Sequence, residues 1–367
     1  MDAKCLNDRR RSRRPKSMTI RVLLGIVAST FMVTLSATLP SSAASSASST
    51  SPASAANGTG QSASDLAAPS ASSGCPSVAC SSVLAEVAAA TKIKSLPSNL
   101  TPTLQDAQSD LHVPPGGTCG TLGIPGLSPM YEPCTYGSSR SPTRIVLLGE
   151  SHAWMWSTPI ESIAQNNGDA FALLYHSACN VVLTASSLPV QGAVGQAPSG
   201  AQCAQWLRAA MTWINAYKPQ IVIVTTVNGF DTPQQESTYL KGLHEVFEGL
   251  RAPGRRLIML GDIPLPAQNG PECLAAHESD VQSCSTPEPA AVNYIFLRNK
   301  SYVREAATLR TVGASLVDVI PWFCTKSVCP AVIGSYEVYQ DQFHATSTYA
   351  AHLTSVMATA LGFSPTS

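Results

Sequence analysis

Ser151 follows a short apolar run, residues 145–148, and stands in the sequence Gly149-Glu150-Ser151-His152. This pattern predicts a buried strand that turns sharply into a helix, with the serine hydroxyl exposed at the corner. Backbone N–H groups at the start of such a helix can bind a developing oxyanion. A serine nucleophile needs a histidine base, and the base needs an acid that orients it.

Asp341 and His344 supply such a pair near the other end of the chain, three residues apart, so one turn can present both on the same face. We therefore predict a hydrolase or acyltransferase in which Ser151 is the nucleophile, His344 the base and Asp341 its partner. A plainer interpretation is that Ser151 only caps a helix that starts near Ala153, and that His344 is a loop histidine with no catalytic role. The pairing of the two segments favours catalysis. His152 lines the site or braces the turn, and we assign it no catalytic role.

The charge of the chain is uneven, although the formal net charge of its 367 residues is zero. Residues 1–21 hold eight of the 23 basic residues and two of the 23 acidic ones, so the remainder has 15 basic and 21 acidic side chains. A mildly acidic body argues against a nucleic-acid partner, which favours a basic face. The 44% hydrophobic content is ample for a large core.

The N-terminal region predicts export. Residues 1–44 combine a basic start, an apolar run and small residues suited to cleavage, which is typical of a signal peptide or an uncleaved signal anchor. We expect residues 45–74 to form a Ser/Ala-rich flexible linker, residues 75–142 a segment that wraps the domain, and residues 143–367 the catalytic domain. We expect an extracytoplasmic protein, secreted or anchored to the outer face of the cytoplasmic membrane, that meets the membrane only through its N-terminal segment.

Cysteine usage agrees with export. Besides Cys5 there are ten cysteines, which fall into neighbouring pairs. An even number in an exported chain favours disulfides. The predicted bonds are Cys75–Cys80, Cys119–Cys134, Cys179–Cys203, Cys273–Cys284 and Cys324–Cys329. Zinc is the competing interpretation for Cys324 and Cys329, whose spacing is roughly that of metal ligands, but no second close pair accompanies them.

From residue 143 onward, strand and helix patterns alternate. Apolar strands are predicted at residues 145–148, 171–175, 221–227, 257–261 and 315–320. Helices are predicted at residues 82–94, 153–166, 204–217, 233–250, 294–312 and 347–361, the last with a cap at Thr346 or Ser347. This alternation predicts an α/β fold with a parallel sheet between helices. Ligands bind beyond the carboxyl ends of such strands, where both Ser151 and the pair Asp341/His344 are expected.

Several short motifs occur in order along residues 82–363. They are Leu96-Pro97 through Asp110, Ile145 through Ala153, Ser177-Ala178-Cys179, Cys203 with Trp206, Gly261-Asp262-Ile263-Pro264, and the closing set Cys324, Cys329-Pro330, Tyr339, Asp341 and His344. In this order they resemble the SGNH/GDSL hydrolases, and most of all the SGNH domains associated with membrane acyltransferases of the O-antigen acetylase type.

The resemblance implies a flavodoxin-like three-layer α/β/α sandwich with a five-stranded parallel sheet. It also implies hydrolysis or transfer of short acyl groups, commonly acetyl, on carbohydrates. The oxyanion donors implied are the backbone N–H of Ser151, a backbone N–H near Ser177 and an asparagine side chain, for which Asn228 is the nearest candidate. The alternative for Asn228 is a turn, since Asn-Gly is a strong turn pair. The chain departs from the family pattern in having Glu150 in place of Asp, Ser177 or Ala178 in place of a common Gly, and Asn228 in an unusual context.

Together these features predict an exported serine acyl-ester hydrolase or O-acyltransferase that acts on a cell-envelope or extracellular glycan, or on another acylated small molecule. No metal or organic cofactor is implied, and a separate membrane acyltransferase is the predicted protein partner. The alternative is a non-catalytic glycan-binding or assembly module that has kept the fold.

Overall fold

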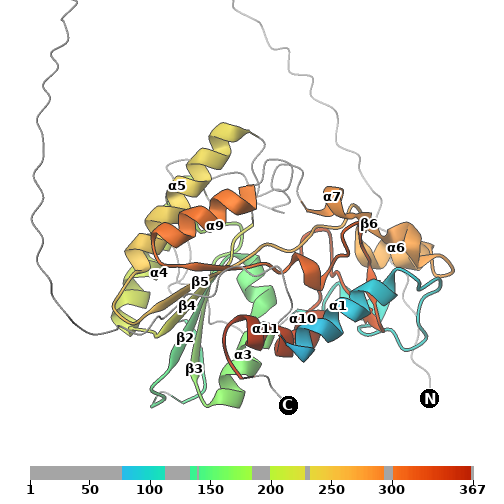
Figure 1. Cartoon of the computed structure of the whole chain (residues 1–367), viewed down its shortest axis with the longest axis horizontal. Helices are drawn as coiled ribbons and strands as arrows, with labels where there is room; N and C mark the ends of the chain where they lie inside the picture. Colours follow the sequence, from blue (N-terminus) through green and yellow to red (C-terminus); the bar gives the residue numbers. More distant parts are fainter. Residues whose placement is uncertain are drawn as a thin grey trace, which may run out of the picture. The chain divides into compact units, whose positions relative to one another are not determined.

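A six-stranded sheet lies at the centre of the fold (Figure 1). The computed structural model describes residues 77–111, 133–138, 140–183, 199–227, 232–292 and 301–364. All of them belong to one compact unit, residues 66–367. In spatial order the strands are β1 (Cys134–Tyr136), β3 (Ala170–Tyr175), β2 (Arg144–Gly149), β4 (Ile221–Val224), β5 (Arg256–Leu260) and β7 (Ser315–Val317).

The five predicted strands are all present and run parallel to one another. The sixth strand, β1, pairs antiparallel with β3 at the edge and was not predicted. It falls within the segment that we expected only to wrap the domain. A three-residue strand carries little periodicity of its own, so its pairing with β3 is decided by the sheet rather than by local pattern.

The apolar side chains of the strands alternate between two cores, which is why each strand is buried throughout its centre. One face packs against α3 (Ser151–Asn167), α11 (Thr354–Ala360) and α1 (Val78–Ala90). The other face packs against α4 (Gly200–Tyr217), α5 (Pro233–Leu250) and α9 (Ser301–Thr311). The result is the three-layer α/β/α sandwich that the sequence predicted.

Helix ends follow the capping residues. The prediction of 233–250 matches α5, because the Thr232 side chain accepts a hydrogen bond from the Gln235 N–H and Pro233 occupies the first turn. The prediction of 82–94 is displaced from α1, since Ser77 caps that helix by accepting from the Cys80 N–H and the helix ends at Ala90.

The last predicted helix, 347–361, is two helices in the structure. Helix α10 (Ser347–His352) is capped by the Thr346 hydroxyl, and the chain breaks at Leu353 before α11 begins. The predicted apolar stripe is buried along both pieces, at Ala350, Leu353, Val356, Met357 and Leu361. The strand predicted at 315–320 ends at Val317, because Asp318 accepts a hydrogen bond from the Ile320 N–H and turns the chain into a short 3₁₀ segment (Ile320–Trp322).

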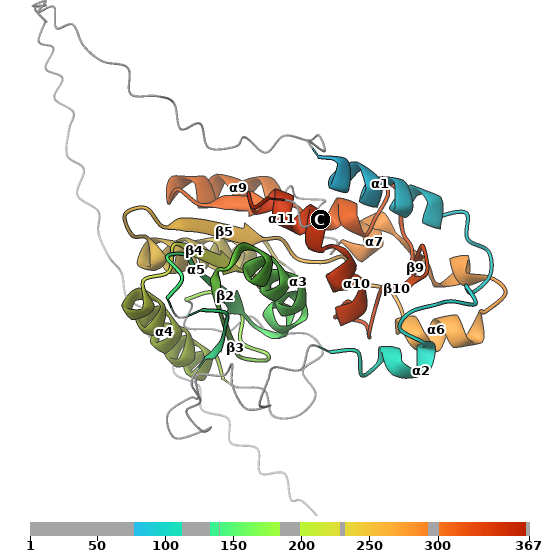
Figure 2. The same ribbon diagram turned by 90° about the horizontal axis from the view of Figure 1, so that it is seen from below.

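A smaller group of elements lies beyond α3 and α10, at the end away from α4 (Figure 2). It comprises the helices α2 (Leu104–Ala107), α6 (Gly270–Ala276) and α7 (Glu288–Ala291), a 3₁₀ turn (Val281–Cys284), and the short strands β6 (Thr286–Pro287), β8 (Val328–Cys329), β9 (Val332–Ile333) and β10 (Tyr336–Glu337). Its own apolar cluster includes Leu274, Val281 and Val332.

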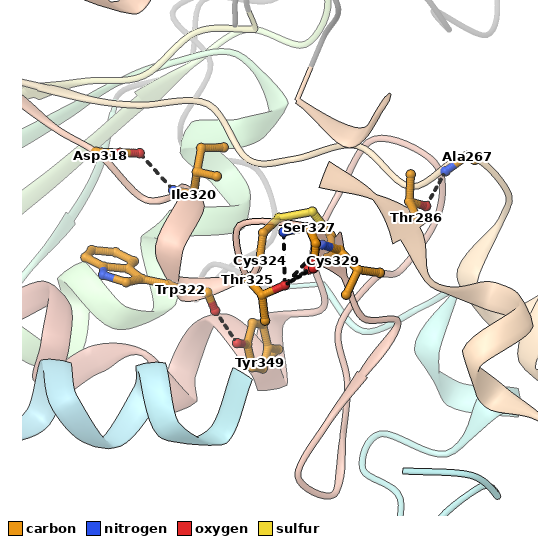
Figure 3. The surroundings of a disulfide bond; sticks show 11 residues. Ala267, Thr286, Asp318, Ile320, Trp322, Cys324, Thr325, Ser327, Cys329 and Tyr349 are labelled. Atoms are coloured by element: carbon orange, nitrogen blue, oxygen red, sulfur yellow. Dashed lines mark hydrogen bonds between the residues drawn. A yellow bond between two sulfur atoms is a disulfide. The ribbon is translucent and has the colours of Figure 1, made fainter. Parts of the chain in front are cut away.

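Three of the predicted disulfides are present: Cys179–Cys203, Cys273–Cys284 and Cys324–Cys329. Figure 3 shows the Cys324–Cys329 bond, beside a loop that Thr325 closes and close to the hydrogen bond from the Tyr349 hydroxyl to the Trp322 carbonyl. This bond excludes the zinc interpretation of the pair. Cys80 and Cys134 are also disulfide-bonded, and their predicted partners Cys75 and Cys119 lie outside the described residues.

The predicted signal segment and linker, residues 1–74, also lie outside the described residues. Among the helices that are described, none has the length and apolar character needed to cross a membrane.

Candidate active site

The corner between β2 and α3 presents Ser151. Gly149 ends the strand, and a Cβ atom there would lie 2.7 Å from the Thr225 carbonyl oxygen and 2.6 Å from the Ala153 Cβ. Only glycine lets α3 start this close to the neighbouring strand end. Ser151 is the first residue of the helix, where backbone N–H groups have no helical acceptor.

The position of this corner within the sheet also favours a binding site. Strand β2 is the first parallel strand of the sheet and lies between β3, which follows it in the chain, and β4, which comes next. The strand order therefore reverses at the carboxyl end of β2. In open α/β sheets such a reversal leaves a crevice where ligands bind.

The loop that carries Asp341 and His344 is fixed by its own hydrogen bonds. Asp341 Oδ1 accepts from the backbone N–H groups of Phe343 and His344, each at 2.7 Å. The Gln340 N–H donates to the His344 carbonyl at 2.9 Å, so the loop is closed at its base. The predicted three-residue spacing is thus realised as an Asp-centred turn.

The structure brings the three predicted side chains together from segments 193 residues apart. His344 Nε2 lies 2.8 Å from Ser151 Oγ, and His344 Nδ1 lies 2.9 Å from Asp341 Oδ2. The His344 side chain is 21% exposed and that of Asp341 36% exposed. The hydrogen-bonded series from Ser151 through His344 to Asp341 is therefore partly open to solvent at its Asp341 end. Such an arrangement can pass a serine proton to an oriented imidazole.

Electrostatics favour a charged Asp341. Burial by itself would raise the pKa of this carboxyl, but the hydrogen bond and charge of His344 and the two backbone N–H groups outweigh burial and lower the pKa. Asp341 therefore stays a carboxylate that can orient the His344 ring.

Helix α10, which begins three residues after His344, is held by Asp110 from the N-terminal segment. The Asp110 carboxylate accepts from the Thr348 N–H at 2.8 Å, and its carbonyl accepts from the Ser347 N–H at 3.0 Å. The Ser347 hydroxyl also lies 2.8 Å from the Thr158 hydroxyl of α3. Asp110, which the sequence marked only as part of a motif, thus ties the His344 segment to the rest of the fold.

Glu150 caps α3, so the plainer interpretation, in which Ser151 only caps this helix, is wrong. Its Oε2 accepts from the His152 N–H at 3.0 Å, so Glu150 and not Ser151 caps α3. The same oxygen lies 2.9 Å from Ser151 Oγ. The longer Glu side chain, in place of the usual Asp, therefore reaches the nucleophile candidate itself.

His152 and Asp262 form a second histidine–carboxylate pair that sequence reasoning did not find. His152 Nδ1 lies 2.8 Å from Asp262 Oδ1, with the two side chains 1% and 13% exposed. The His152 ring meets the His344 ring edge-on, with centroids 5.4 Å apart. One feature of the sequence does indicate this pair. Asp262 follows β5 and His152 follows β2, and the carboxyl ends of these parallel strands lie at the same edge of the sheet.

The predicted oxyanion donors are only partly placed. Ser177 lies in a tight turn just after β3, where the Cys179 N–H donates to the His176 carbonyl and Ala178 has a φ of 62°. This turn adjoins β2, because the His176 N–H donates to the Gly149 carbonyl at 3.1 Å. Asn228 lies outside the described residues. Within the part of the chain that is described, no group of three His, Cys, Asp or Glu residues could hold a metal ion.

Comparison with known proteins agrees with this fold. One similar solved structure is the periplasmic domain of a lipopolysaccharide acetyltransferase of Salmonella ser. Paratyphi A, with a TM-score of 0.51 and 14% sequence identity over 69% of this chain and 94% of that one. No curated protein matches the chain. The family model described as "SGNH domain (fused to AT3 domains)" matches residues 118–359, more than half of the chain. The chain therefore belongs to the SGNH domain family.

Proposed function

We propose that this protein is a serine acyl-ester hydrolase or O-acyltransferase that acts on an O-acyl, most simply O-acetyl, group of a cell-envelope or extracellular glycan. The observation that carries the proposal is the hydrogen-bonded line from Ser151 Oγ through His344 to Asp341. Membership of the SGNH domain family and the fold shared with an acetyltransferase periplasmic domain support the same class of reaction.

In the proposed reaction, His344 Nε2 accepts the Ser151 proton while Ser151 Oγ forms a bond to the acyl carbonyl carbon. The Ser151 backbone N–H and a backbone N–H near Ser177 bind the oxyanion, with the Asn228 side chain as the third proposed donor. The ester bond then breaks, the leaving alcohol takes its proton from His344, and an acyl-Ser151 intermediate remains. Water or a sugar hydroxyl, deprotonated by His344, accepts the acyl group and regenerates the serine.

We infer an extracytoplasmic location and a membrane acyltransferase as partner. The three described disulfides are typical of oxidising compartments, and the similar Salmonella structure is a periplasmic domain. The family is described as fused to AT3 domains, which suggests a partner that delivers the acyl group. A signal peptide or signal anchor within residues 1–44 would supply the route of export.

The proposal is tested by reacting the purified protein with a fluorophosphonate and by measuring hydrolysis of a chromogenic acetyl ester. We expect labelling at Ser151 and turnover that the Ser151→Ala variant lacks, with a fall on the order of 10⁴-fold or more. Ser162→Ala is the matched control, because Ser162 lies on the same helix and donates only to the Thr158 carbonyl. Full activity in a folded Ser151→Ala variant would exclude the nucleophile assignment.

Hydrolase and transferase are separated by repeating the assay with oligosaccharide acceptors. A transferase should release alcohol faster with acceptor and yield an acetylated sugar, detected by mass spectrometry. A hydrolase should release acetate at an unchanged rate. If the folded protein neither reacts with the probe nor turns over the ester, a non-catalytic glycan-binding or assembly module becomes the better description.

A further inference from the structure

The Ser151 hydroxyl has two acceptors within hydrogen-bonding distance, although it carries only one proton. His344 Nε2 lies at 2.8 Å and Glu150 Oε2 at 2.9 Å. Because Asp341 faces His344 Nδ1, the proton of a neutral ring lies on Nδ1 and leaves Nε2 free to accept. A hydroxyl that donates to His344 is ready to lose its proton, whereas one that donates to Glu150 is not.

An uncompensated Glu150 carboxylate would oppose the reaction in two ways. A carboxylate is a stronger acceptor than a neutral imidazole, so it would hold the hydroxyl away from the base. Its charge would also repel the negative charge that develops on Ser151 Oγ during attack. Glu150 is fully buried, so water screens neither effect well.

His152 can supply the compensating positive charge. Burial by itself lowers the pKa of this imidazole, but the carboxylates of Glu150 and Asp262 outweigh burial and raise it to about 9. The titratable groups around the ring come from three segments: Glu150 at the helix start, Asp262 after β5, and His344 with Asp341 from the 340–344 loop. Beyond Asp262, Glu305 of α9 interacts with Asp262 and accepts a hydrogen bond from Tyr239 of α5.

We propose that His152, positively charged between Glu150 and Asp262, is a positioning residue that offsets the Glu150 carboxylate and so lets the Ser151 hydroxyl donate to His344. This inference rests on the proposed function. His152 acts through Glu150 and touches no reacting atom.

The test is a double-mutant cycle on kcat/KM for the acetyl ester, with His152→Gln, Glu150→Gln and the combined variant. We expect His152→Gln to lose about 10- to 100-fold, mainly in kcat, because the serine is held in the wrong orientation. Glu150→Gln removes the charge but keeps an amide oxygen that can still cap α3, so the combined variant should recover most of the loss. If the combined variant is as slow as the product of the two single effects, the compensation model is wrong.

The pH profile is an independent readout that a merely structural role would not move. In the wild-type protein kcat/KM should fall at alkaline pH as His152 loses its proton. Asp262→Asn removes one of the two carboxylates that hold that proton, so the alkaline fall should move to lower pH. In Glu150→Gln the alkaline fall should disappear, since no carboxylate is left to offset. Unchanged alkaline limbs in both variants would overturn the proposal, even if His152→Gln does not fold.

Ser151→Ala in the same series separates the two hypotheses. If Ser151→Ala is inactive while a folded His152→Gln keeps full activity, only the positioning role fails. If Ser151→Ala keeps full activity, the proposed function fails, and the positioning role fails with it.

Discussion

At the residue scale, the three side chains His344, Asp341 and Glu150 differ in what they can do with the Ser151 proton. His344 has one ring nitrogen on the serine and the other on a carboxylate, which is the arrangement that the proposed proton transfer requires. Asp341 also accepts hydrogen bonds from two backbone N–H groups, which hold its carboxylate in place independently of the His344 ring. Glu150 is a second acceptor for the Ser151 hydroxyl and also caps α3.

The proposed roles of His344 and Asp341 predict unequal losses on mutation. His344→Ala should lower kcat nearly as much as Ser151→Ala, on the order of 10⁶-fold, because the Ser151 proton then has no base that can pass it to the leaving alcohol. Asp341→Asn should lower kcat by about 10⁴-fold, since the asparagine can still order the loop but no longer favours the correct tautomer. Steady-state kinetics on the acetyl ester measures both losses.

The same roles predict that kcat/KM falls at acid pH as Asp341 gains a proton, because a protonated carboxyl no longer holds His344 in the correct tautomer. Despite burial, the pKa of Asp341 is lowered by its hydrogen bonds and by the charge of His344, so this fall should lie below the usual range of a carboxyl. If His344→Ala keeps more activity than Asp341→Asn, or shows the same acid fall as the wild-type protein, the two roles are wrongly assigned.

At the scale of elements, the site depends on how closely α3 follows β2. Strand β2 is paired on both sides along its length, so its end is held rigidly. The helix begins two residues later and turns its first N–H groups toward the carboxyl edge of the sheet. Gly149 makes this approach possible, because any Cβ would meet the Thr225 carbonyl on β4's side and Ala153 on the helix side.

Gly149→Ala should therefore damage both stability and activity. The added methyl forces the strand end or the helix to shift, which costs about 1–3 kcal/mol in the free energy of unfolding. A displacement of Ser151 by a fraction of an ångström should also lower kcat by at least about tenfold. Urea denaturation and ester kinetics measure the two effects.

Gly249→Ala on α5 is the matched control, because a methyl there meets only the flexible end of the Met211 side chain. Equal losses in the two variants would show that Gly149 has no special steric role.

At the scale of the whole described unit, the smaller group of elements beyond α10 contains a buried carboxyl in β10, shortly before the Asp341–His344 loop in the chain. Glu337 of β10 is fully buried, and neither of its carboxyl oxygens has a hydrogen-bond partner among the described residues. Burial and the charge of Asp110 raise the pKa of Glu337 from 4.5 to about 8. The carboxyl is therefore protonated in the folded protein at neutral pH.

This raised pKa predicts a stability that decreases with pH. The folded state binds the Glu337 proton more tightly than the unfolded state, so the contribution is fully present below about pH 4.5 and is lost as pH rises through about 8. The loss is on the order of a few kcal/mol. Glu337→Gln should flatten the fall in melting temperature between pH 6 and 9, whereas Glu272→Gln, at an exposed position, should not. A parallel pH dependence in wild-type and Glu337→Gln proteins would contradict this.

The disulfides predict a ranking at the same scale. Cys179–Cys203 spans 24 positions of sequence and Cys324–Cys329 only five. If a disulfide acts mainly on the unfolded chain, removing the first should lower the free energy of unfolding by about 3 kcal/mol and removing the second by about 2 kcal/mol. All four cysteines are buried, so the paired Cys→Ser variants are comparable. A larger loss from the shorter loop in urea titrations would argue against this account.

Much of this protein is determined locally and could be read from the sequence. The strand-to-helix corner at Ser151, the Asp341–His344 turn, the α5 helix with its Thr232 cap and three cysteine pairs all depend on residues close together in the chain. Covalent geometry and the periods of helix and strand fix such arrangements, so spacing alone predicts them. The five parallel strands and their helices followed for the same reason.

Only the tertiary structure determined which residues contact these local segments. The pairing of β1 with β3, the support of α10 by Asp110, the capping of α3 by Glu150 instead of Ser151, and the contact of His152 with Asp262 were all absent from the predictions. Three of these four contacts join segments far apart in the chain. The remaining one, the capping of α3 by Glu150, depends on the side-chain conformation that the buried carboxyl can adopt. Such contacts depend on the order of strands and on the close packing of helices against them, which no spacing within a single segment encodes.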